Sequence, residues 1–464
     1  MLGLLLTLAV VAWVGTMLLR KARAQGVLLA AGFVLLACSV IFHTQPLLSP
    51  AKSTGWVFFD IFDVMRGQMS TRLAGLGLTI MSIGGFVRYM EVSGANRAMV
   101  ECSAVVLKLV HSPILVIIVG HCIGQVLNLF IPSHTGLSML LMLTLYPILV
   151  HAGLSRLTSC AVIATAKFTD LGPVSSNAIL AAHTAGMDPV SYFIGYQLPA
   201  ILPSVVIVGI AHCVVQPWFD RRDAAKVALS APPPPQESRP KADTSKPAVI
   251  PPRIYAVLPV LPLALVVAFC PLFHTGINMD MITAILICMF ITMVFEFIYR
   301  RNFRLVIDNV MTFFEGMGRQ FIAVVSLVIT AEIFGLGLMK IGGIDTLLSA
   351  AQSAGFGLGP MIVTVSVLMF LCAFIMGSGN ASFFAFASLG PRIATFLHVP
   401  AVQILMPMEL STGMGRCFSP IAPPIVAVAT IAEVSPMAVV RRCAIPVGAA
   451  FITYLINSFI LYVL

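Results

Sequence analysis

The stretch "MGSGNASFFAF" (residues 376–386) interrupts an apolar run with four residues that break helices and form hydrogen bonds. The apolar run covers residues 361–375, and further Phe and Ala residues follow the tetrad at 377–380. Unwound backbone at membrane depth leaves N–H and C=O groups that are costly unless satisfied, so it is tolerated only where protein surrounds it or where it lines a cavity. We therefore predict a re-entrant or discontinuous helix whose tip faces a cavity.

The composition indicates a protein that crosses a membrane many times. Of the 464 residues, 59% are hydrophobic and 10% are charged, and the mean hydropathy is +1.00, which excludes a soluble globular domain. The net charge of +9 comes from short basic runs between apolar segments, such as Arg221/Arg222 and Arg441/Arg442. This pattern follows the positive-inside rule, so it sets the orientation of the chain and gives no reason to expect a nucleic-acid partner.

Apolar segments predict the spans and the domain organisation. Residues 2–18 are apolar with no basic residue before them, which predicts a retained first span and no secretory signal. We expect further spans near 26–43, 73–90, 113–131, 191–215, 255–273, 278–298, 321–338, 360–376 and 444–463, with two broken regions at 132–186 and 377–434. The expected organisation is N-terminal spans over 1–59, a first repeat over 60–217, a disordered Pro-rich cytoplasmic linker over 218–253, a connecting helical hairpin over 254–304 and a second repeat over 305–464.

The two halves of the chain match at a nearly constant offset. Pro173 matches Pro420 and Pro189 matches Pro436, both at an offset of 247 residues. The final span of the second half begins beside Arg441/Arg442, whereas the matching span of the first half ends at Arg221/Arg222. Because basic residues mark the cytoplasmic side, the two copies must face in opposite directions. An inverted repeat with broken helices is the architecture of secondary transporters.

Each copy contains a polar tip and a second polar break, and together they predict an anion site. The tips are "IPSHTG" (131–136) and "GSGN" (377–380), and the second breaks are "FTDLGPVSSN" (168–177) and "STGMGRCFSP" (411–420). Helix N-termini offer unpaired N–H groups, and two symmetry-related tips suit a molecule with two carboxylates. The candidate substrate-binding residues are Ser133, His134, Thr135, Gly136, Ser175, Ser176, Asn177, Gly377, Ser378, Gly379, Asn380, Ser382, Ser411, Thr412, Arg416 and Ser419.

Arg416 is the strongest of these candidates. A guanidinium inside a membrane costs about 2.5 to 3.5 kcal/mol by insertion scales, so its presence suggests a function. It could bind a substrate carboxylate through two parallel hydrogen bonds. The alternatives are a side chain that reaches the lipid headgroups and an internal pair with Glu409.

Three acidic residues inside or beside apolar segments are candidates for ion coupling: Asp170, Glu332 and Glu409. Each could carry a proton or ligate Na⁺ near the tips, and no other cofactor or metal is expected. The alternative is that these acids pair internally with Arg416 or Lys167; Lys167 and Asp170 are three residues apart, which suits such a pair. His134 either tunes anion binding by titrating near neutral pH or acts as a structural hydrogen-bond donor.

Several segments resemble the bacterial anaerobic C4-dicarboxylate carriers of the DcuC family, with the DcuD branch the most similar. They are "RLAGLGLTIMSIGGFVRYMEVSGANRAMV" (72–100), "MGSGNASFFAFASL" (376–389), "HVPAVQILMPM" (398–408), "RCFSPIAPPIVAVA" (416–429) and "SPMAVVRRCAIP" (435–446). The resemblance implies a multi-pass protein of the bacterial inner membrane that moves succinate, fumarate or malate by exchange, efflux or ion-coupled uptake. It also implies kinship with the ion-transporter superfamily, whose members commonly form homodimers. The tip "PSHTG" departs from the family pattern, which usually lacks His there.

Three other functions are compared with this expectation. An enzyme is not expected, because no motif such as HExxH occurs and the nine His are dispersed. A channel would show a ring of pore-lining charges. A carrier of another organic anion, such as an amino acid or a tricarboxylate, is the main alternative, because the tips specify only a negative charge.

Overall fold

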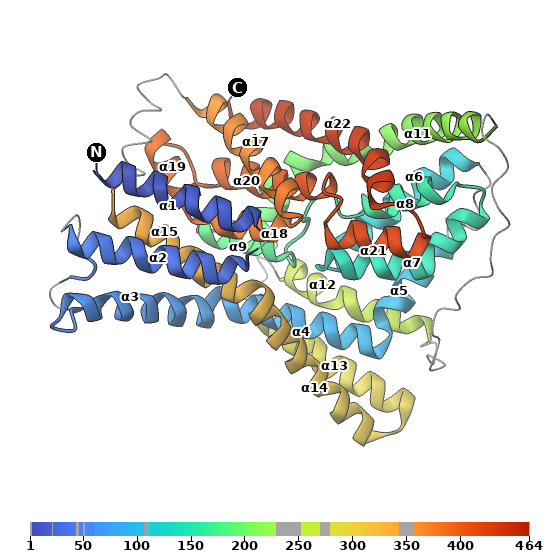
Figure 1. Ribbon diagram of the computed structural model, residues 1–464. Coiled ribbons are helices and arrows are strands. Elements are labelled where there is room, and N and C mark those ends of the chain that lie inside the picture. The colour runs from blue at the N-terminus through green and yellow to red at the C-terminus, as the bar shows by residue number, and fades with distance from the viewer. Residues whose placement is uncertain are drawn as a thin grey trace.

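The computed structural model describes residues 2–20, 22–42, 46–49, 52–105, 107, 110, 112–228, 252–269, 279–342 and 357–463. Every regular element in these residues is a helix, as the composition predicts (Figure 1). Within them, eight helices are long and apolar enough to cross a membrane. The prediction of an all-α polytopic membrane protein is confirmed.

The first half contains α1 (Leu2–Leu19), α2 (Ala24–Ile41), α3 (Val57–Arg72), the π-helical turn η2 (Leu73–Gly77), α4 (Leu78–Ser93), α5 (Ala95–Ala104), α6 (Pro113–Asn128), α7 (His134–His151), α8 (Arg156–Ala164), α9 (Ser176–Thr184), α10 (Pro189–Tyr192), the π-helical turn η4 (Phe193–Gln197) and α11 (Leu198–Ala228). The second half contains the 3₁₀ helix η5 (Arg253–Val260), α12 (Leu261–Ala268), α13 (Met281–Arg300), α14 (Phe303–Gln320), the π-helical turn η7 (Phe321–Val325), α15 (Ser326–Lys340), α17 (Leu358–Met376), α18 (Gly379–Phe386), the 3₁₀ turn η8 (Ala387–Leu389), α19 (Gly390–Leu397), α20 (Val402–Cys417), α21 (Pro423–Ala432) and α22 (Pro436–Tyr462).

Two long helices cross near the centre of the molecule and have the same construction. One covers Val57–Ser93 (37 residues) and the other Phe303–Lys340 (38 residues), so each is longer than the span that hydropathy predicts. Each is interrupted by one π-helical turn, η2 or η7. Figure 1 shows that α3 and α4 run from left to right, whereas α14 and α15 return from lower right to upper left. The crossing depends on glycine, because a Cβ on Gly316 would lie 2.6 Å from the backbone oxygen of Gly84.

The pairing of α11 with α22 shows the inversion of the two copies directly. Ser204 Oγ, near the start of α11, donates a hydrogen bond of 2.9 Å to the carbonyl of Ala450 in the middle of α22. At one end, Arg442 near the start of α22 forms 2.6 Å ion pairs with Asp220 and Asp223 near the end of α11. The two helices are therefore antiparallel, which confirms that the same element runs in opposite directions in the two copies.

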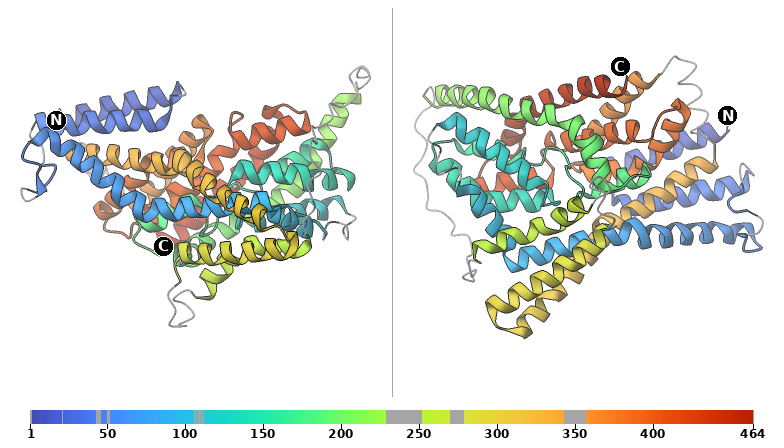
Figure 2. Two further views of the ribbon diagram at one scale, coloured as in Figure 1. Left: turned by 90° about the horizontal axis from the view of Figure 1, so that it is seen from below. Right: turned by 180° about the vertical axis from the view of Figure 1, so that it is seen from behind.

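Each copy contains a re-entrant hairpin and a broken helix. The hairpins are α6 with α7, joined by residues 129–133, and α17 with α18, joined by residues 377 and 378. The broken helices are α8 with α9 and α20 with α21, separated by residues 165–175 and 418–422. In Figure 2, the view from behind shows α11 (light green) and α22 (dark red) along the same edge of the molecule. Residues 165–175, between α8 and α9, are all buried, so this irregular segment lies within the protein, as membrane energetics requires.

The structure corrects the predicted boundaries of the linker and of one span. Helix α11 continues to Ala228, so the linker predicted to begin at 218 begins as helix. The reason is a cluster of contacts: Arg442 bonds Asp220 and Asp223 and also lies 5.1 Å from the ring of Phe219. The predicted disorder of residues 229–251 lies outside the described residues. The span predicted at 255–273 consists of η5 and α12, which end at Ala268, and residues 270–278 also lie outside the description.

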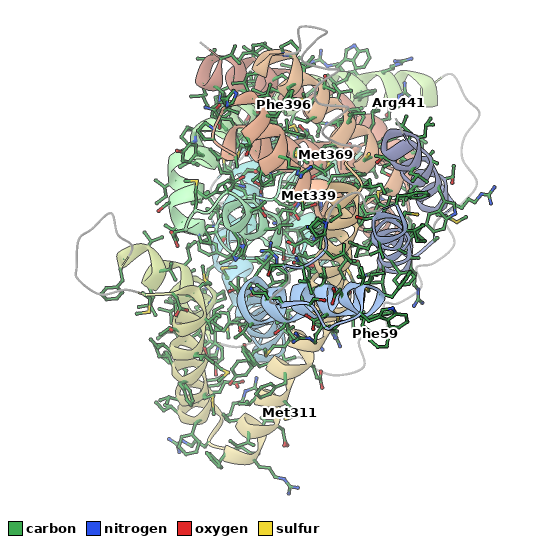
Figure 3. The ribbon with its side chains drawn as sticks, turned by 90° about the vertical axis from the view of Figure 1, so that its left-hand side faces the viewer. Phe59, Met311, Met339, Met369, Phe396 and Arg441 are labelled. Atoms are coloured by element: carbon green, nitrogen blue, oxygen red, sulfur yellow. The ribbon has the colours of Figure 1, made fainter. Side chains whose placement is uncertain are left out.

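The outer surface carries many exposed apolar side chains. Phe59 is 55% exposed and Met311 is 58% exposed, and Figure 3 shows Met311 on the α13–α14 hairpin, which projects from the rest of the molecule. Apolar side chains exposed around a helical bundle are those expected to contact lipid tails.

Candidate functional site

The two tips, which are more than 240 residues apart in sequence, line one cavity with a volume of ≈ 300 Å³. The first copy contributes Pro132, Ser133, His134, Thr135, Asp170 and Ser176, and the second contributes Gln320, Ala323, Val324, Gly377, Ser378, Asn380, Arg416, Pro423 and Pro424. The convergence of two polar breaks from opposite copies, which the sequence pattern predicted, is therefore present in the fold.

Each tip ends in a serine that caps a helix. The Ser133 hydroxyl accepts a hydrogen bond of 3.1 Å from the Gly136 N–H at the start of α7. The Ser378 hydroxyl accepts one of 3.2 Å from the Ala381 N–H at the start of α18. A serine hydroxyl that accepts one hydrogen bond still has its own proton to donate. Both tips therefore present hydroxyl donors and the positive ends of helix dipoles near the same cavity.

The second tip needs glycine at two positions. Gly377 has a φ of +67°, a left-handed conformation that ends α17 and turns the chain. A Cβ on Gly379 would lie 3.0 Å from the Thr412 carbonyl and 3.2 Å from the Arg416 guanidinium. The tip therefore packs against α20 so closely that a larger side chain would have to displace one of these groups.

Arg416 lies in the wall of the cavity with 5% of its surface exposed. Its Nη1 donates to Asp170 Oδ2 at 3.2 Å, and its Nη2 donates to the Lys167 carbonyl at 3.1 Å. Its Nε is buried without a hydrogen-bond partner among the described residues. The alternatives of a lipid-facing Arg416 and an Arg416–Glu409 pair are therefore wrong, because the ionic partner is Asp170.

Asp170 is held by groups from three directions. In addition to Arg416, Asn177 Nδ2 donates to Asp170 Oδ2 at 3.0 Å, and Lys167 Nζ lies 3.5 Å from Asp170 Oδ1. Lys167 is fully buried, and its Nζ also donates to Asn128 Oδ1 at 2.6 Å. The predicted internal Lys167–Asp170 pair is confirmed, and it forms part of a larger network than the sequence indicated.

Glu409 lies behind the cavity wall and is fully buried. The Tyr192 hydroxyl donates to Glu409 Oε2 at 2.6 Å, and Gln197 Nε2 donates to Glu409 Oε1 at 2.8 Å. Gln197 Nε2 also donates to the Asp170 carbonyl at 2.9 Å, while its Oε1 accepts from the Gly172 N–H at 2.9 Å. Gln197 therefore links Glu409 to the loop that carries Asp170.

Glu332, the third acidic candidate, is not among the residues that line the cavity. It forms an ion pair with Arg72, whose Nη1 also lies 3.2 Å from His183 Nδ1 on α9. This pair connects the two long helices to a broken helix. Of the three acids, only Asp170 lies both in the cavity wall and beside Arg416.

The remaining predicted residues form a second layer around the cavity. Thr412 Oγ1 donates to the Glu409 carbonyl at 2.6 Å, and Ser382 Oγ donates to the Ser378 carbonyl at 2.7 Å. His134, in contrast, lines the cavity, and its Nε2 also lies 3.3 Å from the Ala164 carbonyl, a contact of the kind expected of a structural histidine. The other predicted residues outside the cavity lining are Gly136, Ser175, Asn177, Gly379, Ser411 and Ser419; the hydroxyls of Ser411 and Ser419 are buried without a partner in the described part of the chain.

Sequence reasoning missed two kinds of residue. Gln320 lines the cavity from the end of α14, directly before the π-helical turn η7. Tyr192, the last residue of α10, and Gln197, the last residue of η4, both donate hydrogen bonds to Glu409. For Gln197 the available signal was a lone amide in an apolar run, whereas Gln320 follows Arg319 and has no such signal in the sequence. Both glutamines lie at a π-helical turn, a feature that often occurs at functional sites.

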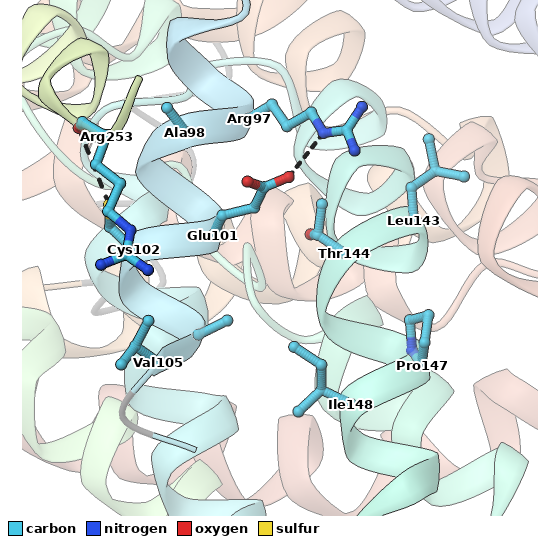
Figure 4. A pocket seen from close by; sticks show the side chains of 11 residues that line it. Arg97, Ala98, Glu101, Cys102, Val105, Leu143, Thr144, Pro147, Ile148 and Arg253 are labelled. Atoms are coloured by element: carbon cyan, nitrogen blue, oxygen red, sulfur yellow. Dashed lines mark hydrogen bonds and ion pairs between the residues drawn. The ribbon is translucent and has the colours of Figure 1, made fainter. Parts of the chain in front are cut away.

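A second hollow lies between α5 and α7 and has a volume of ≈ 510 Å³ (Figure 4). Its charged residues are Arg97, Glu101 and Arg253, and Arg97 Nε donates to Glu101 Oε1 at 2.8 Å. Arg253 is the last residue of the predicted cytoplasmic linker, so the positive-inside rule predicts that this hollow faces the cytoplasm. It contains none of the predicted site residues.

Comparisons with known proteins agree with this architecture. The model of the family described as "C4-dicarboxylate anaerobic carrier" (DcuC) matches residues 2–463. The chain is 31% identical to an Escherichia coli K12 protein named "Anaerobic C4-dicarboxylate transporter DcuC", over 98% of this chain and 96% of that protein. It is also 31% identical to a Vibrio cholerae relative that carries the DcuC name, over 99% of this chain and 98% of the relative.

The fold is similar to that of a solved structure, the Alcanivorax borkumensis YdaH transporter, with a TM-score of 0.61 and 14% identity over 95% of this chain and 99% of that one. With eight candidate spans in the described residues and bacterial transporters as relatives, the chain is a multi-pass protein of the inner membrane. The family match across almost the whole length shows that the chain belongs to the DcuC family of anaerobic C4-dicarboxylate carriers.

Proposed function

We propose that this protein is a secondary transporter that carries C4-dicarboxylates, such as succinate, fumarate or malate, across the bacterial inner membrane by alternating access. The names of its relatives from E. coli and V. cholerae support this substrate class. The observation that carries the proposal is the cavity where two serine-capped helix starts and Arg416 meet. Transport proceeds by exchange, efflux or ion-coupled uptake.

The chemistry of the cavity suits a small dianion. In this proposal, one carboxylate of the substrate lies at each tip, where hydroxyl protons and helix dipoles favour negative charge. Arg416 adds a full positive charge in a wall that is largely shielded from water, where a hydrogen bond to a charged group is worth about 1.5 to 3 kcal/mol. The volume of ≈ 300 Å³ lies at the lower end of the range of about 300 to 1,000 Å³ for small-molecule sites.

The repeat architecture places the cavity between two kinds of element that could move against each other, as alternating access requires. The tips belong to short hairpins and broken helices, whereas Gln320, Ala323 and Val324 belong to a long helix at its π-helical turn. The substrate therefore lies where short elements meet a long one. Movement of the hairpin units against the long helices would expose this site to each side of the membrane in turn.

The hollow in Figure 4 suggests a cytoplasmic route to the cavity. It lies beside Leu143, Thr144 and Pro147 of α7, the helix whose first turn forms the tip. At 1.5 Å per residue, the ten residues from His134 to Thr144 correspond to about 15 Å. Because Arg97 is paired with Glu101, Arg253 leaves this hollow, the vestibule, with a net positive charge that would raise the local concentration of dianions.

Counterflow in proteoliposomes tests the proposal. Purified protein is reconstituted in liposomes loaded with succinate, and accumulation of labelled external succinate is measured. We expect saturable counterflow that fumarate and malate inhibit, and that acetate or citrate inhibits weakly. A carrier of another organic anion would show the reverse order of competition, and flux that does not saturate would indicate a channel.

A further inference from the structure

The cavity proposed to bind a dianion has a carboxylate in its own wall. Asp170 is the one acidic side chain among the described residues that line it, and Arg416 is the one guanidinium. The two are joined by a 3.2 Å ion pair. A carboxylate of the substrate that binds Arg416 must therefore compete with Asp170, which already forms an ion pair with this arginine.

We propose that Asp170 is the ionic partner of Arg416 when no substrate is bound, and that a carboxylate of the substrate replaces Asp170 as this partner on binding. This inference rests on the proposed function and deepens it, because it identifies the internal group against which the substrate competes. Asp170 is then a determinant of affinity whose charge opposes the substrate.

The hydrogen-bonding capacity of Arg416 is not fully used by its present partners. Its contact with Asp170 uses a single Nη1–Oδ2 bond of 3.2 Å, longer than the roughly 2.7 to 2.9 Å of strong charge-assisted bonds. Nη2 is bound to a neutral backbone carbonyl, and Nε is buried without a partner among the described residues. A carboxylate free to orient in the cavity could form the parallel two-bond arrangement that guanidinium favours.

Asp170 also has other partners that would remain after it leaves Arg416. Asn177 Nδ2 donates to it at 3.0 Å, and Lys167 Nζ lies 3.5 Å from its second oxygen. The displaced carboxylate would therefore keep one cation and one amide. This lowers the cost of displacement, because a buried carboxylate with no partner would be strongly unfavourable.

The charges around Asp170 come from both copies. Lys167 lies on its own loop, Arg416 and Glu409 lie on α20, and His134 lies at the tip of α7. Glu409 is linked to the Asp170 loop through Gln197. The Asp170–Arg416 pair thus joins the break of the first copy to the broken helix of the second, and substrate binding would release that connection.

The test is succinate binding to the purified full-length protein, measured by isothermal titration calorimetry at fixed pH and salt. Asp170→Asn keeps the size of the side chain and one acceptor oxygen, which can still accept from Arg416 and Asn177, but it removes the charge and the second acceptor, which faces Lys167. We expect about tenfold tighter binding, the size of effect expected when one of two neighbouring carboxylates is neutralised. Adding Arg416→Gln to this variant should abolish the gain, because the gain acts through the guanidinium.

Two further variants make the result specific. Asn177→Ala removes the amide that would hold the displaced Asp170, so we expect several-fold weaker binding, the opposite direction from Asp170→Asn. This variant also serves if Asp170→Asn does not fold. Glu315→Gln neutralises an exposed acid on α14 and should bind like the original protein.

The outcomes separate this inference from the proposed function. Equal or weaker binding by folded Asp170→Asn, with normal binding by the original protein, overturns the inference and leaves the function intact. Unchanged or tighter binding by Asn177→Ala also overturns it. If the original folded protein binds no dicarboxylate, the proposed function fails and the inference fails with it.

Discussion

The two polar breaks that meet at the cavity share a fold but differ in chemistry. The break between α8 and α9 spans residues 165–175 and carries Lys167 and Asp170. The break between α20 and α21 spans only residues 418–422, and its charged residue, Arg416, lies in the last turn of α20. The acid and the guanidinium at the cavity therefore come from opposite copies.

The tips show the same difference. The first tip presents Ser133, His134 and Thr135, whereas the second presents Gly377, Ser378 and Asn380. Both begin a helix with a serine cap, which is the feature the repeat preserves. The comparison shows that the two copies of the inverted repeat share the positions of their helix breaks but differ in the side chains at those breaks. A symmetric dianion would therefore be bound by two unequal ends.

Among single substitutions, replacing Arg416 should have the largest effect on this asymmetric arrangement. Arg416→Gln removes the charge and leaves Asp170 with fewer partners. We expect the rate of succinate counterflow to fall about hundredfold, which corresponds to about 3 kcal/mol of lost substrate interaction. Arg416→Lys keeps the charge but loses the planar guanidinium that can form two parallel hydrogen bonds, so it should weaken transport of dicarboxylates far more than transport of monocarboxylates. Initial rates of counterflow with each substrate measure this, and equal weakening of both classes would place Arg416 outside the substrate contacts.

Replacing the polar groups of each tip should sharpen the comparison. We expect Ser378→Ala with Asn380→Ala to abolish measurable transport while the protein still folds, because it removes both donors from the second tip. Ser133→Ala with Thr135→Val should reduce succinate affinity by about tenfold, as expected for the loss of one or two hydrogen bonds to a charged group.

Binding and counterflow of the two tip variants, with thermal unfolding as the control for folding, measure this difference. Loss of a serine cap alone costs about 1 kcal/mol of stability. Succinate exchange that persists in the Ser378→Ala/Asn380→Ala variant would remove the second tip from the site.

The smallest expected effect concerns the vestibule outside the cavity. Arg253→Gln removes one exposed positive charge from the hollow in Figure 4. We expect about a twofold to threefold lower initial rate from the cytoplasmic side at low ionic strength, and almost no change at high salt, because exposed charges are screened. Arg304→Gln, an exposed arginine on α14 away from the hollow, is the matched control. Equal effects of the two variants would exclude a specific vestibule.

The sequence predicted the tips because their residues contradict their surroundings. Gly377 and Ser378 follow a largely apolar run over residues 361–376, where unwound backbone is tolerated only if protein surrounds it or if it lines a cavity. The inversion was also readable, because Arg221/Arg222 and Arg441/Arg442 mark opposite ends of matching spans. The ends of helices were less accurate: α11 reaches Ala228 because Arg442 binds Asp220 and Asp223, a contact across more than 200 residues.

By itself, the sequence determined the membrane setting, the inverted halves and the segments where the helices break, because hydropathy, basic residues and helix-breaking residues act locally along the chain. Only the tertiary structure decided which charged groups meet. Arg416 could have paired with Glu409 seven residues before it, but packing of the two copies places Asp170 at 3.2 Å and leaves Glu409 behind Tyr192 and Gln197. Buried ion pairs depend on distances between distant segments, and no local pattern contains those distances.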